Sequence, residues 1–262
     1  MDSSMRTSAS GMMAQQRMID VIANNLANVN TTGFKRSRLS FEDVLYETVQ
    51  GARITNANTA ESVGPIQIGK GVRVGAVLRL HSDGAPEMTQ RPLDVAIQGD
   101  GFFQVQRPDG TTGYTRDGGF TLSDGGSIVT KDGHPLLPEV TVPADATNVT
   151  INANGIVTAT VAGSNGPTEI GRVEIARFLN PNGLIASGQN EYVESPASGS
   201  PVTGFPEDEG MGGLLQGALE SSNVEIVQEM TDMIAAQRAY EINAKAIQAS
   251  DEMMQATHGL IR

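Results

Sequence analysis

Residues of the kinds that catalyse reactions or bind metal ions are few in this chain and lie far apart. The three histidines, His81, His134 and His258, fall in different parts of the sequence. A catalytic or metal site would need such side chains to be grouped, so their separation favours turn or surface positions. The chain has no cysteine, which excludes disulfides and thiolate metal sites.

Five aspartates spaced seven to nine residues apart are the best candidates for metal ligands. Calcium-binding β-rolls also repeat glycine and aspartate, but they need a strict short period that is absent here. Each of these aspartates precedes a glycine, and Asp-Gly pairs are typical of hairpin turns in which both residues take positive φ. The pattern therefore predicts turns and no metal site. The five pairs begin at Asp100, Asp109, Asp117, Asp124 and Asp132.

Motifs for nucleotide binding and for hydrolysis are missing from the sequence. No P-loop, G-x-S-x-G or H-E-x-x-H pattern occurs. Gly69-Lys70-Gly71 followed by Gly75 has the wrong spacing for a dinucleotide fingerprint. The basic cluster Lys35-Arg36-Ser37-Arg38 could contact an anionic surface, but a solvated face beside an acidic helix is the simpler interpretation. We predict no catalytic residue, no cofactor and no metal ion.

Charge and hydropathy limit the possible partners. The net charge of −12 argues against nucleic acid, whose affinity for proteins comes largely from lysine and arginine on phosphates. No stretch of about eighteen apolar residues occurs, so we expect no membrane insertion. The N-terminal sequence MDSSMRTSASGMMAQQ lacks the apolar run of a secretory signal.

The N-terminal part, residues 1–36, has helical periodicity. Apolar side chains recur in steps of three, four and seven from Met5 to Val29, which predicts an amphipathic helix. We expect this helix to end at Thr31-Thr32, with Gly33 in the left-handed cap position.

A longer helix is predicted in the C-terminal part, residues 206–262, after a polar loop. Ser222 and Glu225 have the spacing of a capping box. Apolar residues then recur in alternating steps of three and four, with gaps at Gln237 and Asp251, as in a coiled-coil seam. The seam residues are Ile226, Met230, Met233, Tyr240, Ala244, Ile247 and Met254.

The two terminal helices are natural partners for each other, because an isolated helix is marginally stable in water. Residues 1–40 carry five basic and two acidic side chains, whereas residues 205–262 carry three basic and ten acidic ones. This difference supports pairing, although two solvated faces that differ by accident are the alternative.

The sequence between the helices predicts β-structure. Residues 81–205 place Asp-Gly and Asn-Gly steps between short β-prone segments, which indicates a compact antiparallel domain. Residues 37–80 alternate apolar and polar side chains at 66–68 and 72–74, which predicts an extended connector or long hairpin. The predicted fold class is α+β: long terminal helices paired as a coiled coil, an extended β connector and a compact antiparallel β-rich central domain.

Three separated segments resemble the signatures of one protein family. ANNLANVNTTGFKR and QRAYEINAKAI, near the two ends, resemble the terminal signatures of bacterial flagellar rod and hook proteins. LDVAIQGDGFFQV followed by GYTRDGGF resembles the central motif of the same family. LHSDGAPEMTQRPLDVAI, LESSNVEIVQEMTDMIAAQRAYE and the chain length resemble its distal rod branch most.

The resemblance implies a structural subunit and no enzyme. Members of the family are exported by the flagellar type III apparatus without a cleaved secretory signal, and they stack helically into a tube. Their terminal helices form its inner wall and a β domain faces outward. A distal rod subunit would build the rigid hollow shaft of the basal body, which spans the periplasm to the outer membrane and transmits motor torque to the hook.

The resemblance also implies partners and leaves alternatives. The implied partners are further copies of the chain, the proximal rod proteins, the hook protein, the L and P ring proteins, the rod cap and the export apparatus. The alternatives are a proximal rod or hook subunit, a secreted adhesin-like binding module, and a cell-wall hydrolase. An adhesin would not need heptad helices at both termini, and a hydrolase would need a catalytic domain for which no residues remain.

The four asparagines at residues 24–30 are expected to form part of an assembly interface. Uncharged amides donate and accept hydrogen bonds together, so they can bridge copies of the same surface without like-charge repulsion. We expect Asn24, Asn25 and Asn28 to face neighbouring copies, and Leu26 and Val29 to face the C-terminal helix. A frayed helix end is the alternative. The other predicted interface residues are Thr32, Gly33, Phe34, Met230, Ile234, Gln237, Arg238, Tyr240, Asn243 and Ile247.

Overall fold

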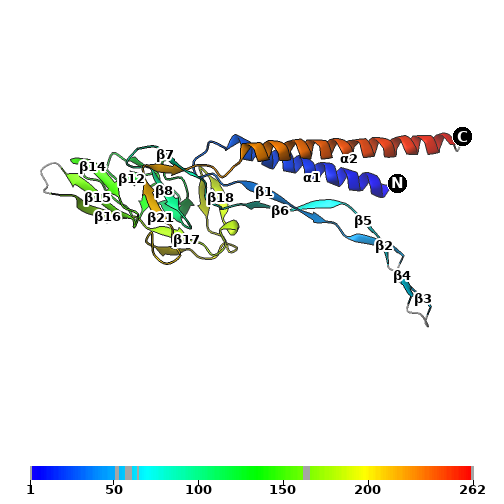
Figure 1. Cartoon of the computed structure of the whole chain (residues 1–262), viewed down its shortest axis with the longest axis horizontal. Helices are drawn as coiled ribbons and strands as arrows, with labels where there is room; N and C mark the ends of the chain where they lie inside the picture. The colour runs from blue at the N-terminus through cyan, green and yellow to red at the C-terminus, as the bar shows by residue number, and fades with distance from the viewer. Residues whose placement is uncertain (1, 51–52, 57–60, 64, 162–165, 261–262) are drawn as a thin grey trace. The chain divides into compact units, whose positions relative to one another are not determined.

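The computed structural model is α+β, with two long helices and many short antiparallel strands (Figure 1). It describes residues 2–50, 53–56, 61–63, 65–161 and 166–260. The chain divides into two compact units. We call Met1–Leu26, Ser37–Leu78 and Glu225–Arg262 the helical unit, and Ala27–Arg36 and Arg79–Val224 the β unit.

The helical unit contains α1 (Asp2–Ala27) and α2 (Ile226–Leu260), which pack antiparallel. The Oγ atoms of Ser4 and Ser250 are 3.2 Å apart, and a Cβ on Gly11 would lie 3.1 Å from Nδ2 of Asn243. The pairing of the terminal helices predicted from the sequence is confirmed.

The ends of both helices differ from the prediction. α1 ends at Ala27, and the N–H of Thr31 donates to the carbonyl of Asn28, so residues 28–31 form a turn. Gly33 does have φ of +66°, but it lies beyond the helix cap. The capping box is also wrong, because α2 begins at Ile226 and Ser222 Oγ accepts from the N–H of Val224 in the loop.

The rest of the helical unit is a two-stranded ribbon made of nested strand pairs. β1 (Ser37–Asp43) pairs with β6 (Val72–Arg79), β2 (Tyr46–Gln50) with β5 (Ile66–Gly69), and β3 (Arg53–Asn56) with β4 (Glu61–Val63). The N–H of Val72 donates to Ser10 Oγ, which ties the ribbon to α1. Residues 51, 52, 57–60 and 64, which belong to the predicted connector, lie outside the described part of the chain.

The β unit is built around one seven-stranded antiparallel sheet with the order β18-β19-β10-β9-β17-β20, in which β13 also pairs with β9. A three-stranded sheet, β14-β15-β16, and the pairs β11-β12, β8-β21 and β7-β22 complete it. One 3-10 turn, η1, spans Pro181–Gly183. The strands are β7 (Pro86–Met88), β8 (Val95–Gln98), β9 (Phe102–Gln106), β10 (Thr112–Thr115), β11 (Thr121–Leu122), β12 (Ile128–Val129), β13 (Leu136–Leu137), β14 (Ala146–Ile151), β15 (Ile156–Val161), β16 (Thr168–Arg172), β17 (Ile175–Arg177), β18 (Ile185–Gly188), β19 (Glu191–Val193), β20 (Val202–Gly204), β21 (Gly213–Gln216) and β22 (Ala218–Glu220).

The central antiparallel region agrees with the prediction, but two local features were missed. β21 and β22 lie in the stretch before α2 that was predicted as loop, and they pair with β8 and β7. In the Asp-Gly turns at Asp109 and Asp132 only the glycine takes positive φ, at +80° and +87°. The predicted turn type, with positive φ at both residues, is therefore wrong at these positions.

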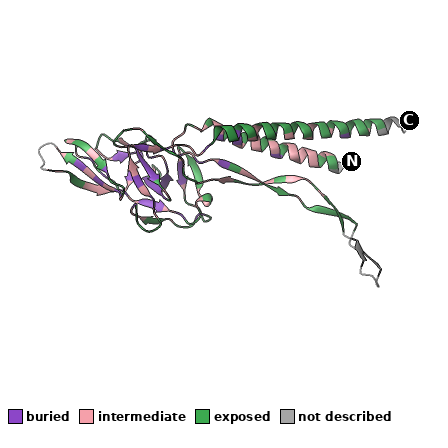
Figure 2. Ribbon diagram, in the orientation of Figure 1, coloured by how far each residue is buried: buried purple, intermediate pink, exposed green. Residues whose placement is uncertain are grey.

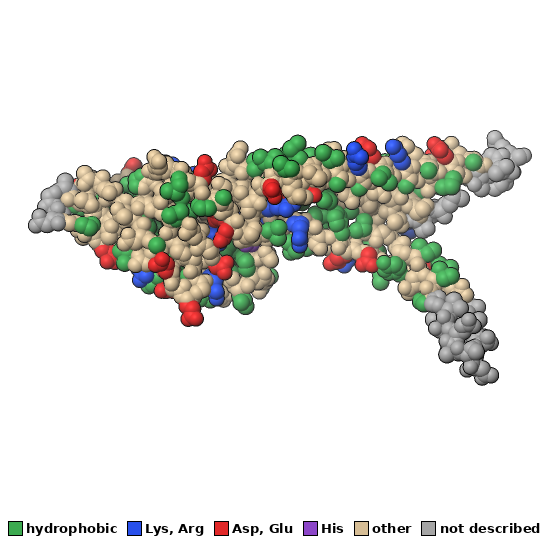
Figure 3. All heavy atoms as spheres, viewed as in Figure 1, with side chains coloured by type: hydrophobic (Ala, Val, Ile, Leu, Met, Phe, Trp, Pro, Cys, Tyr) green, Lys and Arg blue, Asp and Glu red, His purple; other side chains and the backbone are tan. Residues whose placement is uncertain are grey.

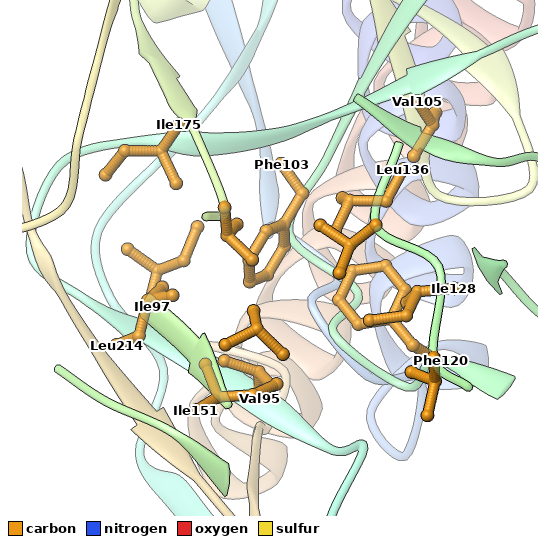
Figure 4. Close-up of a cluster of buried hydrophobic side chains, with 14 residues drawn as sticks. Val95, Ile97, Phe103, Val105, Phe120, Ile128, Leu136, Ile151, Ile175 and Leu214 are labelled. Atoms are coloured by element: carbon orange, nitrogen blue, oxygen red, sulfur yellow. The ribbon is translucent and has the colours of Figure 1, made fainter. Parts of the chain in front are cut away.

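The core of the β unit is apolar and closed (Figure 4). Phe103, Val105 and Ile175 have no exposed surface, and the ring of Phe103 packs edge-on against Phe120 with centroids 5.0 Å apart. Most buried positions among the described residues lie in the β unit, whereas α2 is exposed along most of its length (Figure 2).

Candidate assembly interface

The described residues hold no grouping of His, Asp or Glu side chains that could bind a metal ion. The repeated aspartates stabilise turns: Asp109 Oδ1 accepts from the N–H of Thr111, and Asp117 Oδ1 accepts from the N–H of Gly119. In the described part of the chain, no helix is long and apolar enough to cross a membrane. Exposed apolar side chains are the next candidates for a functional surface.

The first turns of α2 carry an apolar stripe on their exposed face. Ile226, Met230 and Ile234 follow one another at intervals of four residues and are 47, 52 and 52 % exposed, and Val227 beside them is 74 % exposed. Hydrophobic side chains gather over this half of α2 in the space-filling view (Figure 3). We call Ile226, Val227, Met230 and Ile234 the outer stripe of α2.

The seam between the helices lies on the neighbouring face of α2. Its buried and half-buried positions include Glu229, Ala236, Asn243 and Ser250, which recur every seven residues. Met233, Ile247 and Met254, which were predicted for the seam, are half-buried, whereas Ile226 and Met230 are exposed. The sequence therefore predicted the seam positions Met233, Ile247 and Met254 correctly. It wrongly assigned Ile226 and Met230, which belong to the outer stripe, to the seam.

The predicted interface residues on α2 are split between these two faces. Met230, Ile234, Gln237 and Arg238 are exposed. Asn243 and Ile247 are half-buried in the seam, and Tyr240 is 39 % exposed at its margin.

Asn25 is buried within the chain. Its side chain is 1 % exposed, its Oδ1 accepts from the N–H of Ser37, and its Nδ2 donates to Ser37 O at 2.8 Å and to Glu229 Oε2 at 3.1 Å. This corrects the expectation that Asn25 faces a neighbouring copy, because its amide is already satisfied inside the helical unit. Asn24 is exposed, and Asn28 and Leu26 are half-buried.

The segment after α1 belongs to the β unit. Val29, which was expected to face the C-terminal helix, lines a small cavity of the β unit with Glu87 and Leu219. Gly33 donates its N–H to Glu220 O, and a Cβ there would lie 2.8 Å from the backbone of Arg116, so only glycine fits.

Thr32 and Phe34, on either side of Gly33, are half-buried in the β unit. The carbonyl of Thr32 accepts from Asn190 Nδ2. Both residues therefore contribute to the packing of the segment that leaves α1.

Lys35 was expected on a solvated face, and the structure buries it. The side chain is 1 % exposed, and its Nζ donates to Glu220 Oε1 at 2.5 Å and to Ser82 O at 2.7 Å. Burial lowers the pKa of Lys35, and the charge of Glu220 opposes this shift. Arg116, also buried, lies 3.4 Å from Glu220 Oε2. No sequence signal indicates this cluster, because its members are far apart in the chain.

The ribbon carries several exposed apolar side chains close together, which is uncommon on the surface of a monomeric protein. Leu45 is 84 % exposed, Val49 63 %, Ile66 51 % and Ile68 52 %. A two-stranded ribbon is marginally stable in water, and it needs a further strand or surface against its faces. The ribbon and the outer stripe of α2 are thus two surfaces of the helical unit suited to contact with another protein chain.

Comparisons with known proteins agree with this description. Residues 5–35 match the family model for the flagella basal body rod protein, residues 96–159 the D1 domain of the flagellar hook protein FlgE/F/G, and residues 215–260 the C-terminal part of the flagellar basal body rod FlgEFG proteins. These matches cover most of both helices and most of the core residues of the β unit.

Full-length relatives carry the comparison further. The chain is 48 % identical to the flagellar basal-body rod protein FlgG of Borreliella burgdorferi, over 98 % of this chain and 97 % of the relative. It is 45 % identical to FlgG of Caulobacter vibrioides, over 98 % of both chains, and 40 % identical to FlgG of Bacillus subtilis, over 99 % of both. FlgF of Caulobacter vibrioides is 34 % identical over 97 % of this chain.

The paired terminal helices and the β-rich centre, together with these matches, assign the chain to the structural proteins of the flagellar rod and hook class. Within that class, the chain belongs to the FlgG family, the subunits of the distal rod of the flagellar basal body.

Proposed function

We propose that copies of this protein assemble helically through the outer stripe of α2 and the exposed faces of the ribbon, and so form the rigid hollow shaft that transmits torque to the hook. The outer stripe is the observation that carries this proposal. Four apolar side chains on one helix face, each about half exposed or more, lose their contact with water when a second copy packs against them.

The predicted interface residues fit this arrangement to different degrees. Met230 and Ile234 belong to the outer stripe, while Gln237, Arg238 and Asn24 are exposed. Asn28, Leu26, Thr32 and Phe34 are half-buried and are proposed as minor contacts.

The partners of the shaft follow from its place in the flagellum. We propose the proximal rod proteins and the hook protein as end-to-end neighbours, and the L and P ring proteins as the bushing around it. We further propose that the subunit is exported by the flagellar type III apparatus, adds to the rod under a rod cap, and lies between the periplasm and the outer membrane. Membership of the rod family supports assembly with axial proteins of the flagellum.

Substitution of Ile234 tests the interface. Ile234→Asp places a carboxylate where a neighbouring copy packs, and burial of an unpaired charge costs several kcal/mol, about enough to prevent assembly. We expect basal bodies without a distal rod by electron microscopy, while purified subunits keep a folded β unit by circular dichroism. Ala246→Asp adds the same charge at an exposed position on another face of α2 and is the matched control. Normal rods with Ile234→Asp would contradict the proposed interface.

A further inference from the structure

The contacts along the helix seam repeat at a fixed interval. Ser4 meets Ser250, Gly11 meets Asn243 and Asn25 meets Glu229, so each step of seven along α1 matches a step of seven back along α2. The same interval places Met18 opposite Ala236, which is 2 % exposed. We call these four pairs the heptad ladder.

The heptad ladder is made mainly of small and polar side chains. Serine, glycine, asparagine and glutamate bury little apolar area, so this line of the seam adds little to the strength of helix pairing. Polar residues in a heptad seam have a different effect: they disfavour every register in which their hydrogen bonds are lost. The ladder is therefore suited to choosing one register.

Asn25 is the residue of the heptad ladder whose hydrogen bonds depend most on the register of the two helices. Its Oδ1 accepts from the N–H of Ser37 at 2.9 Å, and its Nδ2 donates to Ser37 O and Glu229 Oε2. One side chain thus joins α1, the first residue of β1 and α2. The two bonds to Ser37 fix which way the amide points, and this orientation directs the remaining N–H at Glu229.

A slip of one heptad would break this arrangement. If α2 moved by seven residues toward its own start, Asn25 would face the methyl group of Ala236, and its third hydrogen bond would be lost in a buried site. Aspartate at position 25 would fail for another reason, because it has no N–H for Ser37 O or Glu229 and would bring a second carboxylate to Glu229. Asparagine supplies both the acceptor and the donors.

We propose that Asn25 is the residue that sets the register of the terminal helix pair, and that it does so only when β1 is in place to orient its amide. The helices then pair correctly in a subunit whose ribbon has already folded. The inference deepens the proposed function and rests on it, because correct register is what presents the outer stripe of α2 at the same position in every copy.

Engineered cysteines test the register directly, because the natural chain has none. The pair Ser4→Cys and Ser250→Cys reports the observed register, since the two Oγ atoms are 3.2 Å apart. The pair Met18→Cys and Asn243→Cys reports the slip of one heptad described above, because a shift of α2 by seven residues toward its start brings Asn243 opposite Met18. Disulfide yield after mild oxidation is measured for both pairs in isolated basal bodies and, separately, in concentrated full-length subunit.

We expect the first pair to cross-link and the second to remain reduced when Asn25 is present. With Asn25→Leu, the ratio of the two yields should fall by about tenfold, the change expected when one hydrogen-bonded polar contact no longer separates the registers. Gln16→Leu, an exposed position on α1, is the matched control and should leave the ratio unchanged. An unchanged ratio with Asn25→Leu would overturn the proposal.

A second variant covers the case in which Asn25→Leu does not fold. The double variant Asn25→Leu with Glu229→Leu replaces the polar pair by an apolar one, so the helices should pair at least as tightly but in mixed register. If the double variant keeps the native cross-link alone, Asn25 does not set the register. The presence or absence of rods is scored independently and tests the proposed function, whereas the yield ratio tests the register in either sample.

Discussion

The β unit buries most of its large apolar side chains in one core, whereas the helical unit exposes many of its own. In the β unit, Phe103, Val105 and Ile175 have no exposed surface, and they form a core that is complete in one chain. In the helical unit, Ile234 on α2 and Leu45 on the ribbon are 52 and 84 % exposed, while the helix seam contains buried Asn25 and Glu229. The helical unit thus combines a partly polar seam between its helices with apolar faces that no other part of the same unit covers.

This difference separates two kinds of folding. A closed apolar core supplies its stabilisation within the monomer, so the β unit should fold alone. A long helix pair with a partly polar seam gains less stabilisation from its own contacts. In the proposed assembly, neighbouring copies cover its outer stripe. We therefore expect the helical unit to become ordered on assembly and the β unit to be ordered before it.

The largest effect should appear in limited proteolysis of the dilute monomer. Because cleavage follows local opening, sites in α1 and α2 should be cut on the order of a thousandfold faster than sites in the β unit. Mass spectrometry of the resistant fragment should find a core near residues 81–205, extended by β21 and β22. If the termini of a proven monomer resist the protease, the helical unit is ordered before assembly and the two units do not differ in this respect.

A core substitution should break the β unit without help from assembly. Phe103→Ala removes a fully buried ring and should lower the free energy of unfolding by about 3–5 kcal/mol. Chemical denaturation of the monomer measures this loss. Leu179→Ala, at a side chain that is 94 % exposed, is the control and should change stability by less than about 0.5 kcal/mol. Equal effects would mean that the core is misassigned.

Acid should weaken the β unit through His81. Burial, together with the charges of Lys35, Arg79 and Arg116, lowers the pKa of His81 from 6.5 to about 3. Between these values the unfolded chain binds a proton that the folded unit does not, so the stability that is present above pH 6.5 is lost as the pH falls. The loss from this group should reach up to about 1.4 kcal/mol per pH unit.

Denaturation of the monomer between about pH 5 and about pH 7 measures this slope. His81→Phe keeps an aromatic ring between Phe102 and Tyr192, whose centroids lie 5.6 and 5.5 Å from that of His81, but it cannot titrate. This variant should flatten the slope. The same pH dependence in wild type and variant would show that His81 is not responsible.

The smallest effect on the subunit should come from shortening the ribbon. Deleting residues 52–66, part of which lies outside the described residues, removes the far end of the ribbon and leaves the β unit intact. We expect its free energy of unfolding to change by less than about 0.5 kcal/mol, because the deletion does not touch its core. Rods of this variant should still polymerise but bend or change in length by electron microscopy. Rods as straight and as long as wild type would exclude a role for the ribbon in stiffness.

The sequence alone determined the class of fold and the family. Long 3.6-residue periodicity without proline or glycine identifies α2, and the spacing of Asp-Gly and Asn-Gly steps identifies a turn-rich antiparallel centre, because both are local signals. The three separated motifs indicated the rod and hook family, and the comparisons confirm it. Helix ends at Ala27 and Ile226 were missed by a few residues, since helix boundaries depend on loop contacts such as that between Asn28 and Thr31.

Only the tertiary structure decided which side chains are inside. Two adjacent stripes of α2 fit heptad spacing, and the more apolar one, with Met230 and Ile234, faces outward, because a subunit of a polymer can leave apolar surface for its neighbours. Asn25 and Lys35 are buried because partners more than a hundred residues away, Glu229 and Glu220, satisfy them. Such pairings are set by the folded chain as a whole and leave no local pattern in the sequence.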